Sequence, residues 1–412
     1  MRIARLALYS GAVLLGCYWP RLGRFPLADW FFASAAIIMA TGAILRRISG
    51  GYRSTFAVSG TCVAAGVAIT SAQSSSPGSE IYHGLLLVYL FVVWLPLFEV
   101  LITRQEHFQI LVRCLIVGAV LTGGAAIAQA HFGVKIPYSP PQWGRMSGFT
   151  GNPDGLGTFE ATILPLTLSA IVLSRTIPAK LAFLAAGVVI ITALLLSASI
   201  TGAACATVAV GVFGLLTIRR KRVFLQIGVV TILVALGIGA VWGRFSETPV
   251  LKVASRVTEL HTAGVSNSTL GTRLRGDEEA LRYINRRPLT GAGFNAALPG
   301  VDTLVHNSLL RFWYEGGMLL EAGLLIVLTV GTIRLASLWK PKTQDEGQLV
   351  YRAAVAGAYA SFLLLSSVSP VMFNRADWLG LALIFALTSG SRSRTARLLH
   401  NGRPHGTRRL LE

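Results

Sequence analysis

The chain has 412 residues, of which 53% are hydrophobic and only 13% are charged, and its formal net charge is +19. Because soluble domains carry about 25% charged residues, this composition excludes an ordinary soluble domain and indicates a membrane protein. An excess of Lys and Arg is typical of the cytoplasmic loops of such proteins, so we expect no nucleic-acid partner.

Twelve apolar blocks follow one another along the chain. Most are about 17 to 23 residues long, enough for a helix to cross a bilayer core of ~30 Å. Helices satisfy their own backbone hydrogen bonds inside lipid, so the sequence predicts an all-α polytopic membrane protein with about twelve transmembrane helices. The predicted spans are 5–20, 28–46, 55–72, 82–103, 108–130, 158–175, 180–197, 199–217, 223–243, 318–338, 350–369 and 373–390.

Basic residues gather in the loops on one side if the N-terminus is cytoplasmic. The run "RRKR" at 219–222 and the tail 391–412 lie on that side, whereas the short loops on the other side contain few basic residues, namely Arg21 with Arg24, and Arg375. Positive charge in short loops stays in the cytoplasm, so both termini are predicted to be cytoplasmic. This prediction depends on a break between the seventh and eighth spans, at "LLLSASITGAACA". The first span resembles a signal peptide, but aromatic and basic residues follow it at once, so we expect an uncleaved helix.

Two segments on the predicted outer side, 131–157 and 244–317, are much longer than ordinary connections, and such loops are often functional. The second contains "GTRLRGDEEALRYINRRPLTGAGF", which is predicted to be a helix that Thr272 caps and Pro288 ends. Its apolar face is expected to carry Leu274, Leu281 and Ile284. The chain therefore divides into helices 1–130, a loop with four helices 131–243, a large extracytoplasmic loop 244–317, helices 318–390 and a basic tail 391–412.

The predicted outer side is rich in basic residues. One interpretation is a solvated helix face, paired with acidic residues such as Asp277. The other is an anionic ligand, which the whole set favours because guanidinium groups hold phosphate oxygens with two parallel hydrogen bonds. The basic residues are Lys135, Arg145, Arg244, Lys252, Arg256, Arg273, Arg275, Arg282, Arg286, Arg287 and Arg311.

His306 stands at the end of the long loop. If a helix begins there, Asn307, Arg311 and Glu315 fall at i, i+4 and i+8 on one face, so that Arg311 can pair with Glu315. The glycine pair at 316–317 would then break the helix. A histidine in this place is often structural, but nearby positive charge lowers its pKa and keeps the imidazole neutral, which is the form that a general base requires.

No sequence signature of a cofactor is present. The seven histidines show neither HxxxH nor HExxH spacing, and no GxxxxGK[ST] loop occurs, so we expect no metal and no nucleotide cofactor. The four cysteines, Cys17, Cys62, Cys114 and Cys205, are expected to be unpaired thiols within spans.

Four segments in a fixed order resemble the O-antigen ligase and O-antigen polymerase superfamily of bacterial envelope glycosyltransferases. They are "RMSGFTGNPDGLG", "LLLSASITGAACA", "GTRLRGDEEALRYINRRPLTGAGF" and "VHNSLLRFWYEGG", and the likeness covers roughly residues 140 to 338. The resemblance implies a GT-C-like helical fold in the bacterial inner membrane, with the active site facing the periplasm. It also implies transfer of a glycan from polyprenyl (undecaprenyl) diphosphate to a hydroxyl of a lipid or glycan acceptor, without metal or nucleotide. We expect inversion at the anomeric carbon.

The resemblance also assigns roles to residues. His306 is the expected general base, and Asn307 and Glu315 complete the catalytic set by orienting it. Arg273 and Arg145 are the expected diphosphate contacts, with Arg275 and Arg311 beside them. Ile200 stands where the family often has an arginine, and Leu320 where it has a glycine.

Three alternatives stay open. The first is a polymerase of the same superfamily, and the second is a non-catalytic protein of envelope assembly. The third is a transporter or flippase for an anionic lipid or sugar, which would use ionisable residues near the membrane midplane. The residues of that kind within spans are Glu99, Arg113, Glu160 and Glu321.

Overall fold

A computed structural model of the chain describes residues 1–18, 20–22, 25–45, 52–74, 77–218, 269–298, 304–339 and 346–389. The regular secondary structure of this part is helical, apart from one antiparallel pair of two-residue strands, β1 (Arg21–Leu22) and β2 (Phe25–Pro26). The expected all-α architecture is therefore confirmed for the described residues.

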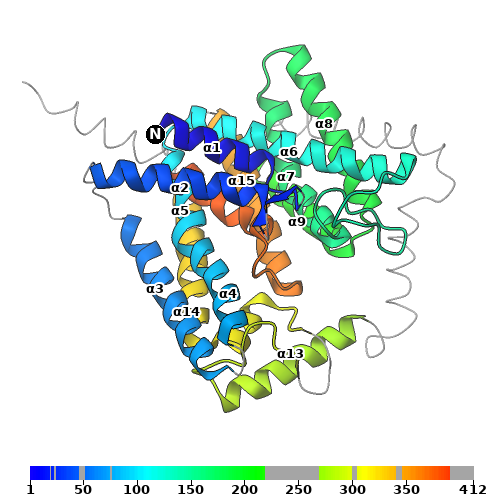
Figure 1. Cartoon of the computed structure of the whole chain (residues 1–412). Helices are drawn as coiled ribbons and strands as arrows, with labels where there is room; N and C mark the ends of the chain where they lie inside the picture. The colour runs from blue at the N-terminus through cyan, green and yellow to red at the C-terminus, as the bar shows by residue number, and fades with distance from the viewer. Residues whose placement is uncertain are drawn as a thin grey trace, which may run out of the picture.

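The helices follow the predicted order (Figure 1). The π-helical turn η1 continues α4 directly into α5, so that these elements form one apolar segment, Gly78–Leu101. The elements are α1 (Arg2–Val13), α2 (Leu27–Leu45), α3 (Tyr52–Gln73), α4 (Pro77–Val88), η1 (Tyr89–Trp94), α5 (Leu95–Leu101), α6 (Gln105–Phe132), α7 (Pro153–Leu173), α8 (Ile177–Leu196), α9 (Ile200–Thr217), α13 (Thr269–Arg286), α14 (Ser308–Ser337), α15 (Glu346–Val368), η2 (Arg375–Trp378) and a last helix over 379–389.

Eight helical segments in the described residues are long and apolar enough to cross a membrane. They correspond to eight of the twelve predicted spans, and the break between α8 and α9 lies where it was predicted. The first predicted span forms only a 12-residue helix, because the chain turns after Val13. The second contains a shorter apolar helix, Leu27–Thr41, and the last begins with a 3-10 turn. The ninth, 223–243, lies outside the described residues.

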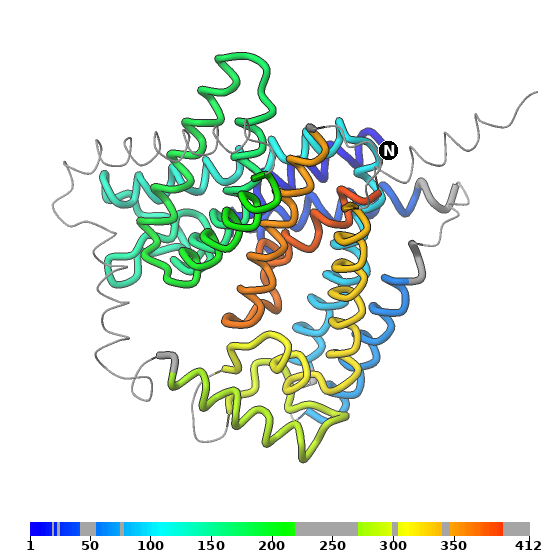
Figure 2. Tube along the Cα trace, turned by 180° about the vertical axis from the view of Figure 1, so that it is seen from behind, coloured from blue at the N-terminus to red at the C-terminus, as the bar shows by residue number. Residues whose placement is uncertain are grey.

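Helix α7 is the most deeply buried of these segments, with helices α8, α9 and α15 packed around it. Helix α14 packs along α3, and α4 lies beside α3 (Figures 1 and 2). Helix α13 crosses the end of this group, where it contacts α14. The two long segments of the predicted outer side therefore lead into the two main helical groups, one at α7 and one at α14.

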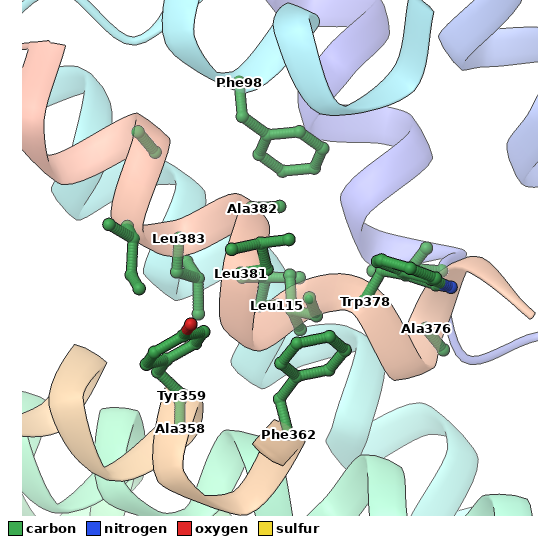
Figure 3. Close-up of a cluster of buried hydrophobic side chains, with 14 of the residues drawn as sticks. Phe98, Leu115, Ala358, Tyr359, Phe362, Ala376, Trp378, Leu381, Ala382 and Leu383 are labelled. Atoms are coloured by element: carbon green, nitrogen blue, oxygen red, sulfur yellow. The ribbon is translucent and has the colours of Figure 1, made fainter. Parts of the chain in front are cut away.

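A buried aromatic cluster connects α5, α6, α15 and the last helix (Figure 3). The rings of Phe362 and Trp378 lie 5.5 Å apart between centroids, and Phe98 and Leu115 are fully buried nearby. Lipid tails are as apolar as these side chains, so the cluster is held by close packing rather than by exclusion of water.

One buried ion pair joins α5 to α14. Arg334 Nη1 lies 2.7 Å from Glu99 Oε2, and both side chains are less than 10% exposed. Charged groups inside a membrane protein are stable when they pair with each other. Glu99 is thus engaged in a contact between helices 235 residues apart in the chain.

The glycine pair at 316–317 packs against the backbone turn at Gly291, which follows α13. Gly317 has φ 71° and ψ −176°, which breaks α14 where the glycine pair was expected to break it. A Cβ on Gly317 would lie 2.2 Å from the carbonyl oxygen of Leu289, and one on Gly291 would lie 2.3 Å from that of Glu315. The backbone N–H of Met318 donates to Pro288 O at 3.0 Å, and that of Gly293 donates to Glu315 O at 3.0 Å. Only glycine permits this backbone contact.

Gly317→Ala is therefore expected to destabilise the protein by about 2 to 4 kcal/mol, because it combines a strained φ with overpacking. The matched control is Gly124→Ala in α6, where a Cβ would meet nothing within 4 Å. That change should stabilise the helix by about 0.5 to 1 kcal/mol. Thermal unfolding of the two detergent-purified variants measures both changes in stability. Equal melting temperatures of Gly317→Ala and Gly124→Ala would contradict the close contact between Gly317 and the Leu289 backbone.

Candidate functional site

His306 lies just before the first residue of α14 and is half-buried. Its Nδ1 is 2.7 Å from the backbone oxygen of Leu304. A carbonyl oxygen can only accept, so Nδ1 carries the hydrogen and donates it. In the neutral ring Nε2 then holds a lone pair, which makes it the atom that can accept a proton.

The surroundings of His306 favour this neutral form. Its pKa lies below the ordinary value of 6.5, chiefly because burial disfavours the charged ring. The positive charges of Arg273 and Arg311 lower the pKa further, whereas the hydrogen bond to Leu304 and the charge of Asp277 raise it. The sequence had indicated positive charge as the cause, but burial is the larger one.

Helix α13 brings Arg273 and Asp277 to His306. These two residues are one turn apart, and the Asp277 carboxylate faces the backbone N–H of Asn307. Burial raises the pKa of Asp277, and the Asn307 N–H, His306 and Arg273 oppose that rise. Among the described residues, Asp277 Oδ1 has no hydrogen-bond partner. Sequence reasoning treated Asp277 only as an ion-pair partner, although its i, i+4 spacing from Arg273 placed both on one face.

Arg273 keeps donors available beside His306. Its Nη1 donates to the carbonyl oxygen of Val368 at 3.2 Å, and its Nε is buried without a partner among the described residues. A buried guanidinium N–H without an acceptor is costly, which makes Arg273 a suitable place for an anionic group.

The buried face of α13 differs from the expected one. Ala280 and Ile284 pack against Leu298, Val305 and Tyr314. Leu274 and Leu281 are instead 49% and 45% exposed, so the predicted apolar face was wrong for both. The helix begins at Thr269 rather than at a Thr272 cap. Small residues such as Ala280 let α13 approach α14 closely, so the leucines face outward. Arg275, which was an expected diphosphate contact, is exposed on α13.

Arg311 and Glu315 form the pair that their spacing predicted. Arg311 Nε lies 2.6 Å from Glu315 Oε1, and the side chains are 4% and 1% exposed. Arg311 Nη2 also donates to Asn295 Oδ1 at 2.8 Å. These bonds engage Arg311 inside the protein, so its guanidinium holds the start of α14 rather than lying open to a diphosphate.

Asn307 is the N-cap of α14. Its Oδ1 accepts from the backbone N–H groups of Leu309 and Leu310, at 3.0 and 3.3 Å. Ser308 Oγ donates to Ser369 O and accepts from Val371 N, both at 2.8 Å. A cap of this kind stabilises a helix by about 1 kcal/mol. Together the two residues fix the position of the preceding His306.

A second cluster contains Arg145. Its Nη2 lies 2.6 Å from Asp154 Oδ1, and its Nε donates to Ser197 O at 2.8 Å. Ser199 Oγ donates to the same Asp154 oxygen at 2.7 Å. The "RMSGFTGNPDGLG" and "LLLSASITGAACA" segments therefore meet, and Ile200 begins α9 directly behind the Ser199 cap. Arg145 is buried in this cluster and does not contact His306.

The fold and this constellation define a multi-pass helical membrane protein whose polar site lies where α13 meets the start of α14. Residues 185–328 match the family described as O-antigen ligase. The matched stretch contains Arg273, His306 and Glu315, and it confirms the likeness to the O-antigen ligase and polymerase superfamily. No curated protein matches the chain. The family match supports a membrane glycan-processing function and implies lipid-linked glycan substrates.

Proposed function

We propose that the protein is an integral-membrane glycosyltransferase that moves a glycan from a polyprenyl diphosphate, such as undecaprenyl diphosphate, to a hydroxyl of a lipid or glycan acceptor. The observation that carries the proposal is the half-buried His306, which holds an available Nε2 beside Arg273, whose Nε has no partner among the described residues. A proton acceptor next to a phosphate-binding cation is what this transfer needs.

In the proposed reaction, Nε2 of His306 takes the proton of the acceptor hydroxyl. The acceptor oxygen bonds to the anomeric carbon from the face opposite the diphosphate, the bond from that carbon to the diphosphate oxygen breaks, and the configuration inverts. Arg273 stabilises the negative charge that develops on the leaving diphosphate. Because diphosphate is already a good leaving group and arginine supplies positive charge, the proposal requires no metal or nucleotide.

Asp277 is a positioning residue in this proposal. Its carboxylate faces the Asn307 N–H and lies close enough to His306 to influence the pKa of that ring. It would favour the imidazolium that forms when His306 accepts the proton, as a neighbouring negative charge favours a positive one. Asn307 and Glu315 act further away, by capping α14 and by holding Arg311.

The proposed location is the bacterial inner membrane, with both termini in the cytoplasm and α13 and His306 on the periplasmic side. The distribution of basic residues among the short loops supports this orientation. Whether the acceptor is a lipid or a second donor glycan distinguishes a ligase from a polymerase. The resemblance of the His-Asn-Ser segment and the arginine helix favours a ligase.

One observation favours the alternative of a transporter for an anionic lipid or sugar. Glu160 in α7 is fully buried, and neither of its carboxylate oxygens has a hydrogen-bond partner among the described residues. Unpaired carboxyl groups within spans are typical of ion and proton pathways. Glu99, by contrast, is already engaged by Arg334.

The pH dependence of transfer tests the role of His306. We expect kcat/KM to fall in acid with an apparent pKa below 6.5, because the lowered pKa of His306 keeps it unprotonated further into acid than a solvent-exposed histidine. Release of polyprenyl diphosphate from a lipid-linked glycan, measured between pH 5 and 8, gives the profile.

Asp277→Asn is the matched variant for this profile. The charge of Asp277 raises the pKa of His306, so removing it should move the acid limb to still lower pH. An acid limb above pH 7, or one that Asp277→Asn shifts upward, would contradict the assignment of His306 as the base.

A further inference from the structure

A cavity of about 480 Å³ lies apart from His306, among four stretches of chain. These are residues 15–18, 21, 25–26 and 28–29 around the β1–β2 pair and the start of α2, the turn of α4 at 82–86, residues 150–152 and 155 at the start of α7, and the segment 373–376 after α15. All four are on the predicted outer side or at the outer ends of spans. The volume is that of an ordinary small-molecule site.

Two arginines line this cavity. The Arg21 guanidinium carbon lies 3.8 Å from the ring centroid of Tyr18 and 5.7 Å from that of Tyr138. Arg21 Nε is buried and has no hydrogen-bond partner among the described residues. Arg375 forms an ion pair with Asp29 and donates from Nη1 to Phe373 O at 3.0 Å. With two arginines and one aspartate, the lining carries net positive charge.

The rest of the lining is largely aromatic. Tyr18, Phe25, Tyr82 and Phe373 all contribute, and the rings of Phe25 and Tyr82 lie 6.4 Å apart between centroids. Aromatic faces give the apolar faces of a sugar ring a surface for contact, whereas arginines hold phosphate oxygens. The cavity thus combines the two kinds of surface that a phosphorylated saccharide presents.

Residues that line the cavity also lie next to the two polar clusters, the one around Arg145 and the one around Arg311 and His306. His83 lines it and donates from Nδ1 to Ser79 O at 2.9 Å, and its Nε2 accepts from Asn295 Nδ2 at 3.1 Å. Asn295 in turn accepts from Arg311, which holds the start of α14. On the other wall, Asn152 caps α7 two residues before Asp154, the partner of Arg145. An occupant would therefore lie between the Arg145 cluster and the residues that position His306.

We infer that this cavity binds a phosphate-bearing saccharide, with the phosphate held by Arg21 and Arg375 and the sugar against the aromatic rings. As a substrate subsite the inference rests on the proposed glycan transfer. The same chemistry occurs in a lipid-linked donor, with phosphate at the anomeric position, and in a phosphorylated acceptor.

The test is binding of inorganic pyrophosphate to the full chain in lipid nanodiscs, measured by titration calorimetry. Arg21→Gln should weaken binding about tenfold, the effect of losing one charge-assisted hydrogen bond, and Arg21→Lys should retain most of it. Replacing Arg375 alone would leave Asp29 without its ion-pair partner. Arg375→Gln is therefore combined with Asp29→Asn, and this double variant should also lose about tenfold in affinity for pyrophosphate. Arg175→Gln, which removes an exposed arginine from the opposite predicted side, is the control.

Competition identifies the source of the phosphate. Displacement of pyrophosphate by undecaprenyl diphosphate and glucose 1-phosphate assigns the cavity to the donor, and displacement by glucose 6-phosphate alone assigns it to the acceptor. Absence of saturable binding, or equal affinities of Arg21→Gln and Arg175→Gln, overturns the inference. Melting temperatures show whether each variant is folded.

His306→Ala separates this inference from the proposed function, since it should bind pyrophosphate as the wild type does. If binding depends on Arg21 but the wild type transfers no glycan, the proposed function fails and the cavity stands. If His306→Ala abolishes transfer while Arg21→Gln binds normally, the cavity inference fails alone.

Discussion

His306→Ala is expected to lower the rate of glycan transfer at pH 7 by about 10²- to 10⁴-fold, the contribution of a positioned general base. The reason is geometric: the Nδ1 hydrogen is committed to Leu304 O, so Nε2 is the atom left to accept the acceptor's proton. The melting temperature should change little, because the ring is only half-buried and makes one hydrogen bond to its own loop.

His131→Ala is the matched control for this prediction. His131 lies at the predicted outer end of α6, is exposed, and has no place in the proposed mechanism. It should retain wild-type turnover. If His306→Ala and His131→Ala turn over alike, His306 is a structural histidine and the proposed base is wrong.

Arg311→Ala is expected to destabilise the protein by about 3 to 5 kcal/mol, the usual result of removing one partner from a buried ion pair. Glu315, with 1% of its side chain exposed, would be left as an uncompensated buried charge. Asn295 Oδ1 would lose the hydrogen bond that it accepts from Arg311 at the same time. The joint change Arg311→Leu with Glu315→Leu should recover much of the loss, because apolar replacements leave no buried charge.

The control for Arg311→Ala is Arg282→Ala, which removes an ion pair of similar sequence spacing on the protein surface. Arg282 lies 3.1 Å from Glu279 with 67% of its side chain exposed, so its loss should cost about 0 to 1 kcal/mol. Thermal unfolding distinguishes the two. If Arg311→Ala keeps its melting temperature and only raises KM, Arg311 contacts substrate as the family resemblance first implied.

Local sequence patterns predicted the start of α14 well. The spacing of Arg311 and Glu315, the Gly317 break and the beginning of a helix beside His306 all depend on contacts within one or two turns. The break between α8 and α9 was also local, because Ser199 caps the second helix. Patterns of this kind are visible in a sequence because the residues that interact are neighbours in it.

Contacts between distant segments could not be predicted. The family resemblance implied that Arg145 contacts a diphosphate, and the sequence did not indicate that Asp154 and the carbonyl of Ser197, 52 residues away, also bind it. The apolar face of α13 was misassigned because small residues, not leucines, determine how closely two helices approach. Arg21 and Arg375 were considered only as markers of topology, since their common cavity joins opposite ends of the chain.

Leu320, where the family resemblance implied a glycine, has a place in the packing of two helices. Leu320 is fully buried where α14 packs along α3, and a Cβ on Gly66 of α3 would lie 2.8 Å from the Leu320 backbone nitrogen. The small residue that permits close approach is thus present on the partner helix. Gly66 thus allows α3 and α14 to pack closely although α14 has a leucine, not a glycine, at position 320.

The central claim is that the protein transfers a glycan between two substrates, and reconstitution in proteoliposomes tests it most directly. The proteoliposomes would receive a polyprenyl diphosphate glycan and candidate acceptors, with no added nucleotide. We expect equal amounts of glycosylated acceptor and free polyprenyl diphosphate, and we expect His306→Ala to produce neither. Movement of the intact donor across the bilayer, with no glycan transferred to any acceptor, would contradict it and identify a transporter.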